Sequence, residues 1–119
     1  MSVNKLTDFG KIKVSNKAIA SIVADATNEC YGVVGICDKD FDKYNEPIVL
    51  DRKHLTDGVV IKTKKEKFEI SLYIIVVSGM KVTEILRSIQ KKVKYVVEKT
   101  LDTSVGKVNV YVQCLKKVD

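Results

Sequence analysis

The residue types that most often carry catalysis are scarce in this sequence. Its 119 residues include no tryptophan, one proline and a single histidine, His54. Nucleophilic catalysis by serine or cysteine would have to use this histidine as its base, and the sequence shows no partner for it. No pair of carboxylates stands in an apolar context that would raise a pKa. We therefore expect a protein that is not an enzyme and that uses no cofactor, metal or small-molecule substrate.

Cysteines are few and irregularly spaced. Cys30, Cys37 and Cys114 are odd in number and lack C-x-x-C spacing. Neither a disulfide framework nor a zinc site is indicated by this pattern. We expect all three to be buried as small apolar residues.

Long apolar runs are also missing. None approaches the ~20 residues that a membrane-spanning helix requires. The N-terminus "MSVNKLTDFGK" becomes polar too early for a signal peptide, so we expect a cytoplasmic protein. The length fits one domain, residues 1–119, in which residues 38–57 form an irregular insert with a short helix or turn around residues 51–55.

Positive charge is abundant, but arginine is not. The net charge is +6 and the pI is about 9.2, yet Arg52 and Arg87 are the only arginines. Arginine offers a rigid fork for bases and phosphates, whereas lysine is a solvated point charge. We expect the lysine-rich faces to be solvated. A small basic module that binds nucleic acid through them, or a small regulatory module, is the alternative to a protein-binding function.

Hydrophobic periodicity predicts alternating strands and helices. "FGKIKV" alternates with period two and predicts a strand at residues 9–14, after which Ser15 is placed to cap a helix. Gly32 should end that helix in a left-handed conformation, followed by a short strand in "VVGIC". A hairpin of residues 59–63 and 68–77 comes next, then a second helix and the alternating strand "GKVNVYVQCLK". In this last strand we expect Val112 and Cys114 on one face and Tyr111 on the other.

This order of elements predicts an α+β fold. The arrangement that satisfies it is a two-layer sandwich, with two long helices packed on one face of a small mixed β-sheet of about four to five strands.

The strand at residues 68–77 is apolar on both faces. Its even-numbered residues can face the helices, but Tyr73, Ile75 and Val77 then point the opposite way, and Tyr111 can extend them on the last strand. An uncovered apolar stripe on a sheet usually marks a contact surface. We therefore predict that these four residues form a protein-contact surface. The alternative is that the insert covers part of this face.

Three short motifs resemble ligand-binding loops but depart from them. "GMKVTEIL" begins at Gly79 and lacks the further glycines of a phosphate loop, so we expect a structural corner. "GVVG" at residues 32–35 has only the bare G-x-x-G of KH domains and is expected to begin a strand. Asp38, Asp40 and Asp42 alternate as in a calcium loop, but its glycine and glutamate are absent. We expect a solvated acidic turn there.

The order of the motifs resembles that of a known family. "GKIKVSNKAIASIVADATNECYGVVGI" is similar to the opening signature of the bacterial alkaline-shock-protein, or envelope stress response, family: a short strand, a serine-capped alanine-rich helix and a Gly-Val step. The stretch from "GVVIKTK" to "VNVYVQCL" resembles the remainder, with a long apolar strand ending in a glycine turn and a helix with Ile89-Gln90 near its middle. The resemblance spans nearly the whole chain. The insert matches least, and Met80 and Lys81 depart from the small polar residues expected after the glycine.

The resemblance implies a function class. Family members are cytoplasmic, non-enzymatic proteins of Gram-positive bacteria and their wall-less relatives, associated with alkaline or cell-envelope stress. They tend to self-associate, and some are held at the inner face of the membrane by a small anchor protein. For this chain the resemblance implies a homo-oligomer that acts through protein–protein contacts. It supplies no catalytic residues.

Overall fold

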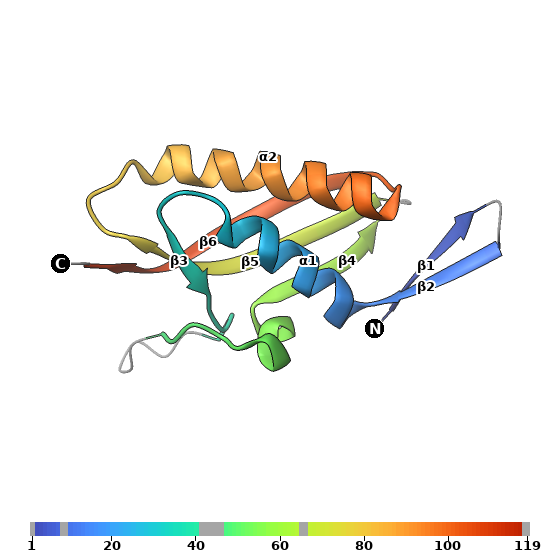
Figure 1. Cartoon of the computed structure of the whole chain (residues 1–119), viewed down its shortest axis with the longest axis horizontal. Coiled ribbons are helices and arrows are strands. Elements are labelled where there is room, and N and C mark those ends of the chain that lie inside the picture. Colours follow the sequence, from blue (N-terminus) through green and yellow to red (C-terminus); the bar gives the residue numbers. More distant parts are fainter. Residues whose placement is uncertain (1, 8–9, 41–46, 65–66, 118–119) are drawn as a thin grey trace.

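The computed structural model describes residues 2–7, 10–40, 47–64 and 67–117. The elements in order are β1 (Ser2–Thr7), β2 (Gly10–Ser15), α1 (Asn16–Asn28), β3 (Val33–Ile36), the 3₁₀ helix η1 (Arg52–Asp57), β4 (Val59–Lys64), β5 (Lys67–Val77), α2 (Val82–Leu101) and β6 (Val105–Lys116). Figure 1 shows α1 and α2 over one face of the main sheet, while the hairpin of β1 and β2 extends away from this body.

Helix α1 begins at the predicted cap, but it ends at Asn28 with Glu29 in a right-handed conformation, so Gly32 marks the turn after the helix and not its last residue. The Ser15 hydroxyl accepts a hydrogen bond from the Ala18 N–H at 3.1 Å, which satisfies one of the free donors of the first turn. Along the helix, Ile19, Ala20, Val23, Ala24, Ala26 and Thr27 are buried. The chain leaves at Gly32, whose φ of +91° is a left-handed conformation that favours glycine.

Strand β5 is the centre of the main sheet, because each other strand of that sheet pairs with it. β6 pairs with it in parallel along one edge, and α2 connects the two strands. On the other edge β4 and β3 pair with it antiparallel, β4 opposite residues 67–72 and β3 opposite residues 74–76. The result is a four-stranded, largely antiparallel sheet in which β3 and β4 lie end to end.

Strands β3 and β4 meet beside Tyr73, where β5 changes partner. The Tyr73 N–H donates to the Gly58 carbonyl at 3.0 Å, and the Cys37 N–H donates to the Tyr73 carbonyl at 2.9 Å. A Cβ on Gly58 would collide with the Cys37 carbonyl oxygen. Since Gly58 has φ −123°, which any residue adopts, glycine is required here for space.

The main core lies between the helices and the sheet. Helix α2 contributes Ile85, Ile89, Val93 and Val97, which recur every four residues. Strand β5 contributes Ile70, Leu72, Ile74 and Val76, and α1 contributes the buried set given above. Each fully buried side chain of this size stabilises the fold by roughly 1.5–3 kcal/mol. This packing fixes which face of β5 the helices cover.

The predicted two-layer α+β architecture is confirmed, with helices on one face of a four-stranded sheet. The hairpin of β4 and β5, the helix cap at Ser15 and the short helix within the insert are confirmed as well. Strand β1 was not expected. Its hairpin partner β2 agrees with the predicted strand at residues 9–14, although Phe9 lies outside the described residues.

The expected face of Cys114 is wrong because β6 contains a bulge. Ile74 pairs with Val112, but the next residue, Ile75, pairs with Cys114. The extra residue, Gln113, reverses the alternation, as a bulge does, and moves Cys114 to the face of Ile75. By the same shift Leu115 pairs with Val76 and lies on the helix side.

Candidate functional site

The face of the sheet opposite the helices is divided into a polar and an apolar half. At the start of β5, the Asn109 side-chain amide of β6 donates to Glu69 Oε1 at 3.1 Å and to Ser71 Oγ at 3.3 Å. Beyond Ser71 the same face of β5 carries Tyr73, Ile75 and Val77. The predicted contact residues therefore occupy only the half nearest the end of β5.

The centre of the apolar half is buried, although no helix lies over it. Ile75 is 2% exposed and Cys37 is fully buried, and neither belongs to the core cluster beneath the helices. The backbone of Cys37 forms an isolated antiparallel β-bridge with that of Val49 in the insert. The Val49 methyl carbons lie 2.6 and 3.0 Å from the position of a Cβ on Gly35, so this side chain packs directly on the glycine.

Gly35 pairs with Ile75, so Val49 reaches the same face of the sheet as Ile75. Gln113 Nε2 of β6 also donates to the Lys39 carbonyl of the insert at 3.2 Å. Around Ile75, the insert covers this face of the sheet, as the alternative expected. Ile75 is therefore part of the covered centre and does not lie on an exposed contact surface.

Exposed apolar side chains surround this centre. The rings of Tyr73 and Tyr111 stack with centroids 4.9 Å apart and planes 17° apart, and Tyr111 is 45% exposed. Tyr73 and Val77 are half-buried, and Val49 is about as exposed as Tyr111. We call Val49, Tyr73, Val77 and Tyr111 the tyrosine rim. Three of its members are residues that the sequence predicted, and Val49 was missed because the insert shows no periodicity.

The cysteines are three free thiols. Burial raises the pKa of Cys37 to about 11, with smaller contributions from Asp38 and Cys114 in the same direction. Burial also raises the pKa of Cys30, against a lowering by the Lys92 ammonium. Because the thiolate is the reactive form, Cys37 is chemically inert at neutral pH. The prediction of burial holds for Cys37, while Cys30 and Cys114 are partly exposed.

His54 has the partner that the sequence did not reveal. Its Nδ1 lies 2.6 Å from Oδ1 of Asp51, and the hydrogen bond with this carboxylate raises the pKa of His54 and lowers that of Asp51. Both side chains are exposed, and Asp51 also caps η1 by accepting from the His54 N–H at 3.1 Å. The pair closes the start of the short helix.

The loop-like motifs behave as structural elements. Gly79 has φ +89° and forms the corner between β5 and α2. The Asp40 N–H donates to Asp38 Oδ1 at 2.8 Å, a local turn, while Asp42 lies outside the described residues. Within residues 2–7, 10–40, 47–64 and 67–117, no group of histidines, cysteines and carboxylates is arranged to hold a metal ion.

The lysines of α2 are exposed, but some have local partners. Lys92 pairs with Glu29, the residue after α1, at 3.0 Å, and Lys99 lies 5.4 Å from the centre of the Tyr95 ring. Lys91 and Lys94 are exposed on the same helix. The first contact links α2 to the end of α1, and the second lies within the surface of α2. The lysines themselves are exposed to solvent, as expected from the sequence.

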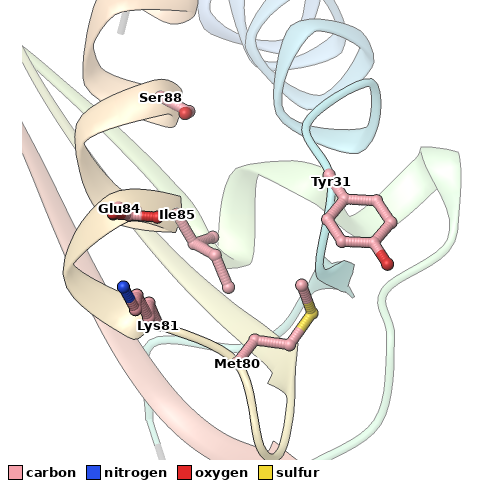
Figure 2. A pocket seen from close by; sticks show the side chains of 6 residues that line it. All are labelled: Tyr31, Met80, Lys81, Glu84, Ile85 and Ser88. Carbon is pink, nitrogen blue, oxygen red and sulfur yellow. The ribbon is translucent and has the colours of Figure 1, made fainter.

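One hollow was not foreseen. It has a volume of about 290 Å³ and lies between the turn after α1 and the first turns of α2. Figure 2 shows Glu84, Ile85 and Ser88 of α2 on one side of it and Tyr31 on the other, with Met80 and Lys81 just before the helix. Ile85 reaches Gly32, where a Cβ would lie 2.7 Å from its Cδ1. The lining mixes apolar and charged groups and contains no arrangement of catalytic groups.

Comparison with known proteins gives a consistent result. Residues 4–117 match the alkaline shock protein 23 family, described by a cell envelope-related function. The uncharacterized protein YloU of Bacillus subtilis (strain 168) is 37% identical over 113 residues, which are 95% of this chain and 94% of YloU. The uncharacterized protein Spy1614 of Streptococcus pyogenes serotype M6 is 34% identical over 118 residues, 99% of this chain and 98% of that protein.

A solved structure with a similar fold is the MamM CTD in its copper form. It has a TM-score of 0.50 and covers 85% of this chain and 87% of that chain, at 12% identity, so the likeness concerns the fold alone. In the described part of the chain no helix is both long and apolar enough to cross a membrane. With a family match over residues 4–117 and two relatives above 30% identity, the chain belongs to the alkaline shock protein 23 family, whose function is related to the cell envelope.

Proposed function

We propose that this chain serves its envelope-related function without catalysis, through protein–protein contacts made by the tyrosine rim. The observation that carries the proposal is an exposed apolar rim around a buried centre, on the one sheet face that no helix covers. Interface centres are rich in aromatic residues, and tyrosine is among the residues that contribute most to binding. Tyr73 and Tyr111 supply two such rings, already stacked on each other.

The stacking prepares the rim for binding. The Tyr73 backbone is held by two hydrogen bonds on the side where β3 and β4 meet, one to Gly58 and one from Cys37, and its ring supports that of Tyr111. A side chain that is ordered before association loses less conformational entropy when it binds. The covered centre below adds rigidity, because Ile75 and Cys37 are packed under the insert. The rim is therefore a fixed apolar surface.

The partners that we propose are a second copy of the chain and a small membrane-anchor protein, with the chain itself in the cytoplasm. Support for the first is the rim described above, and support for the second is the envelope-related function of the family. Neither partner requires a ligand pocket.

Light scattering on the purified chain tests the surface. Tyr111→Lys introduces a charge on the rim, and Tyr95→Lys places the same charge on an exposed position of α2, where Tyr95 is 61% exposed. Figure 1 shows α2 on the opposite face of the sheet. We expect the wild type and Tyr95→Lys to exceed the 13.3 kDa of one chain, and Tyr111→Lys to elute with the mass of one chain. Equal masses for all three proteins would refute the assigned surface.

A further inference from the structure

Strand β6 is a long strand at the edge of the main sheet, and its outer side is available for pairing. It extends over 12 residues, and in the described part of the chain it pairs with β5 alone. An edge strand presents unpaired N–H and C=O groups that another strand can use, and short length, charge or proline normally protect such edges. The opposite edge strand, β4, has only 6 residues and carries Lys62 and Lys64. β6 has no such protection along its middle.

The stretch open to pairing is short and centred on Tyr111. On one side, Gln90 Nε2 of α2 donates to the Val108 carbonyl at 3.1 Å, so a side chain already uses that group. On the other side, the bulge after Val112 interrupts the regular ladder. Val110 to Val112 lie between these two points. This segment has an apolar residue at every position and no charge.

This segment determines how β6 of one chain would pair with β6 of a second copy. In an antiparallel pair, directly opposite residues share a face, and a two-fold axis through one residue sets it opposite its own copy. With the axis at Tyr111, Val110 of one chain lies opposite Val112 of the other. The two Tyr111 rings then lie side by side on the rim face, each stacked on its own Tyr73. Aromatic pairs directly opposite each other stabilise adjacent strands.

We propose that two copies of this chain join their sheets edge to edge, by antiparallel pairing of β6 with β6 about a two-fold axis at Tyr111. The inference rests on the proposed function and adds the geometry of the contact between the two copies. The tyrosine rims of both copies become one continuous surface, in which four rings form a row across the joined sheet.

Cross-linking distinguishes this geometry from other contacts through the same rim. Tyr111→Cys and Val77→Cys are each made in a chain that also carries Cys114→Ser. Both are oxidised mildly at a concentration well above that at which the wild type associates, because loss of the Tyr111 ring weakens the pair. Opposite residues on paired strands have Cβ atoms ~5 Å apart, close to the separation that a disulfide needs. We expect a covalent dimer from Tyr111→Cys and none from Val77→Cys, which is on the rim but on β5.

Hydrogen exchange on the unmodified chain gives a second measurement. Pairing of β6 should slow exchange of the Val110 and Val112 amides, which alternate with the amides bonded to β5, as protein concentration rises, while the amides of β4 stay unchanged. A dimer that cross-links through Val77→Cys and not Tyr111→Cys, without added protection of β6, would overturn edge pairing and leave the proposed function intact. A wild type that is monomeric at every concentration would overturn the inference, and the rim would then serve a different protein.

Discussion

Ile75→Ala is expected to destabilise the fold strongly, although the residue lies on the face away from the helices. Its side chain is 2% exposed, so the truncation leaves a cavity between β5 and the insert. Losses of this kind cost about 2–4 kcal/mol for a buried isoleucine. A chain of 119 residues at roughly 0.05–0.15 kcal/mol per residue has about 6–18 kcal/mol in total, so the loss is easily measured.

Tyr111→Ala is the matched comparison on the same face. Tyr111 is 45% exposed, and its main loss is the stacking on Tyr73, worth about 0.5–1.5 kcal/mol. Urea unfolding followed by far-ultraviolet circular dichroism, at a concentration below association, gives both free energies of unfolding. If Ile75→Ala unfolds within ~0.5 kcal/mol of the wild type, the insert does not cover the centre of this face, and the distinction between centre and rim is wrong.

Three further changes test the structure around the site. Gly58→Ala should cost about 1–3 kcal/mol because its Cβ meets the Cys37 carbonyl, whereas Gly106→Ala, whose nearest neighbour is 3.3 Å away, should cost far less in the same urea assay. Ser15→Ala removes the cap of α1 and should lower the free energy of unfolding by about 1 kcal/mol, with the loss of helix visible by circular dichroism. The raised pKa of His54 means that its pair with Asp51 stabilises the fold fully below pH 6.5, the ordinary value, and that this contribution is lost as pH rises through the folded-state pKa. The stability difference between wild type and His54→Ala should therefore be present at about pH 6 and absent at about pH 9; a difference that grows with pH would contradict the pair.

Much of the fold follows from local pattern in the sequence. The apolar spacing of α1, the cap at Ser15 and the alternation of β5 are determined by residues that are neighbours along the chain, and each appears where it was predicted. The glycines at positions 32 and 79 adopt left-handed conformations, which is the reason that glycine marks these turns. Local rules were sufficient for these elements.

The site depends on contacts between distant residues, which periodicity does not report. Val49 packs on Gly35 and places the insert over Ile75, yet the sequence around Val49 has no regular pattern. The bulge in β6 is equally invisible, because "VYVQCLK" continues an apparent alternation while the register moves by one residue. Consequently the sequence located the apolar face correctly on β5 but did not separate its covered centre from its exposed rim.

The polar half of the same face shows why the contact surface is limited. Asn109, Glu69 and Ser71 form hydrogen bonds with one another across β5 and β6. These bonds do not remove the cost of taking the charged Glu69 carboxylate out of water, and burial of a charge against an apolar partner is costly. The boundary between Ser71 and Tyr73 therefore confines the proposed contact to the end of β5, next to the insert and the bulge.

Sedimentation equilibrium of the wild type and Tyr111→Lys, over the same range of concentrations, measures whether the tyrosine rim mediates self-association. We expect the wild type to self-associate and the substitution to raise the dissociation constant by at least about tenfold, since an aromatic residue at the centre of an interface contributes ~2 kcal/mol or more. Far-ultraviolet circular dichroism should show that the variant keeps its fold. A dissociation constant that is the same for both proteins would contradict the assignment of the tyrosine rim as the contact surface.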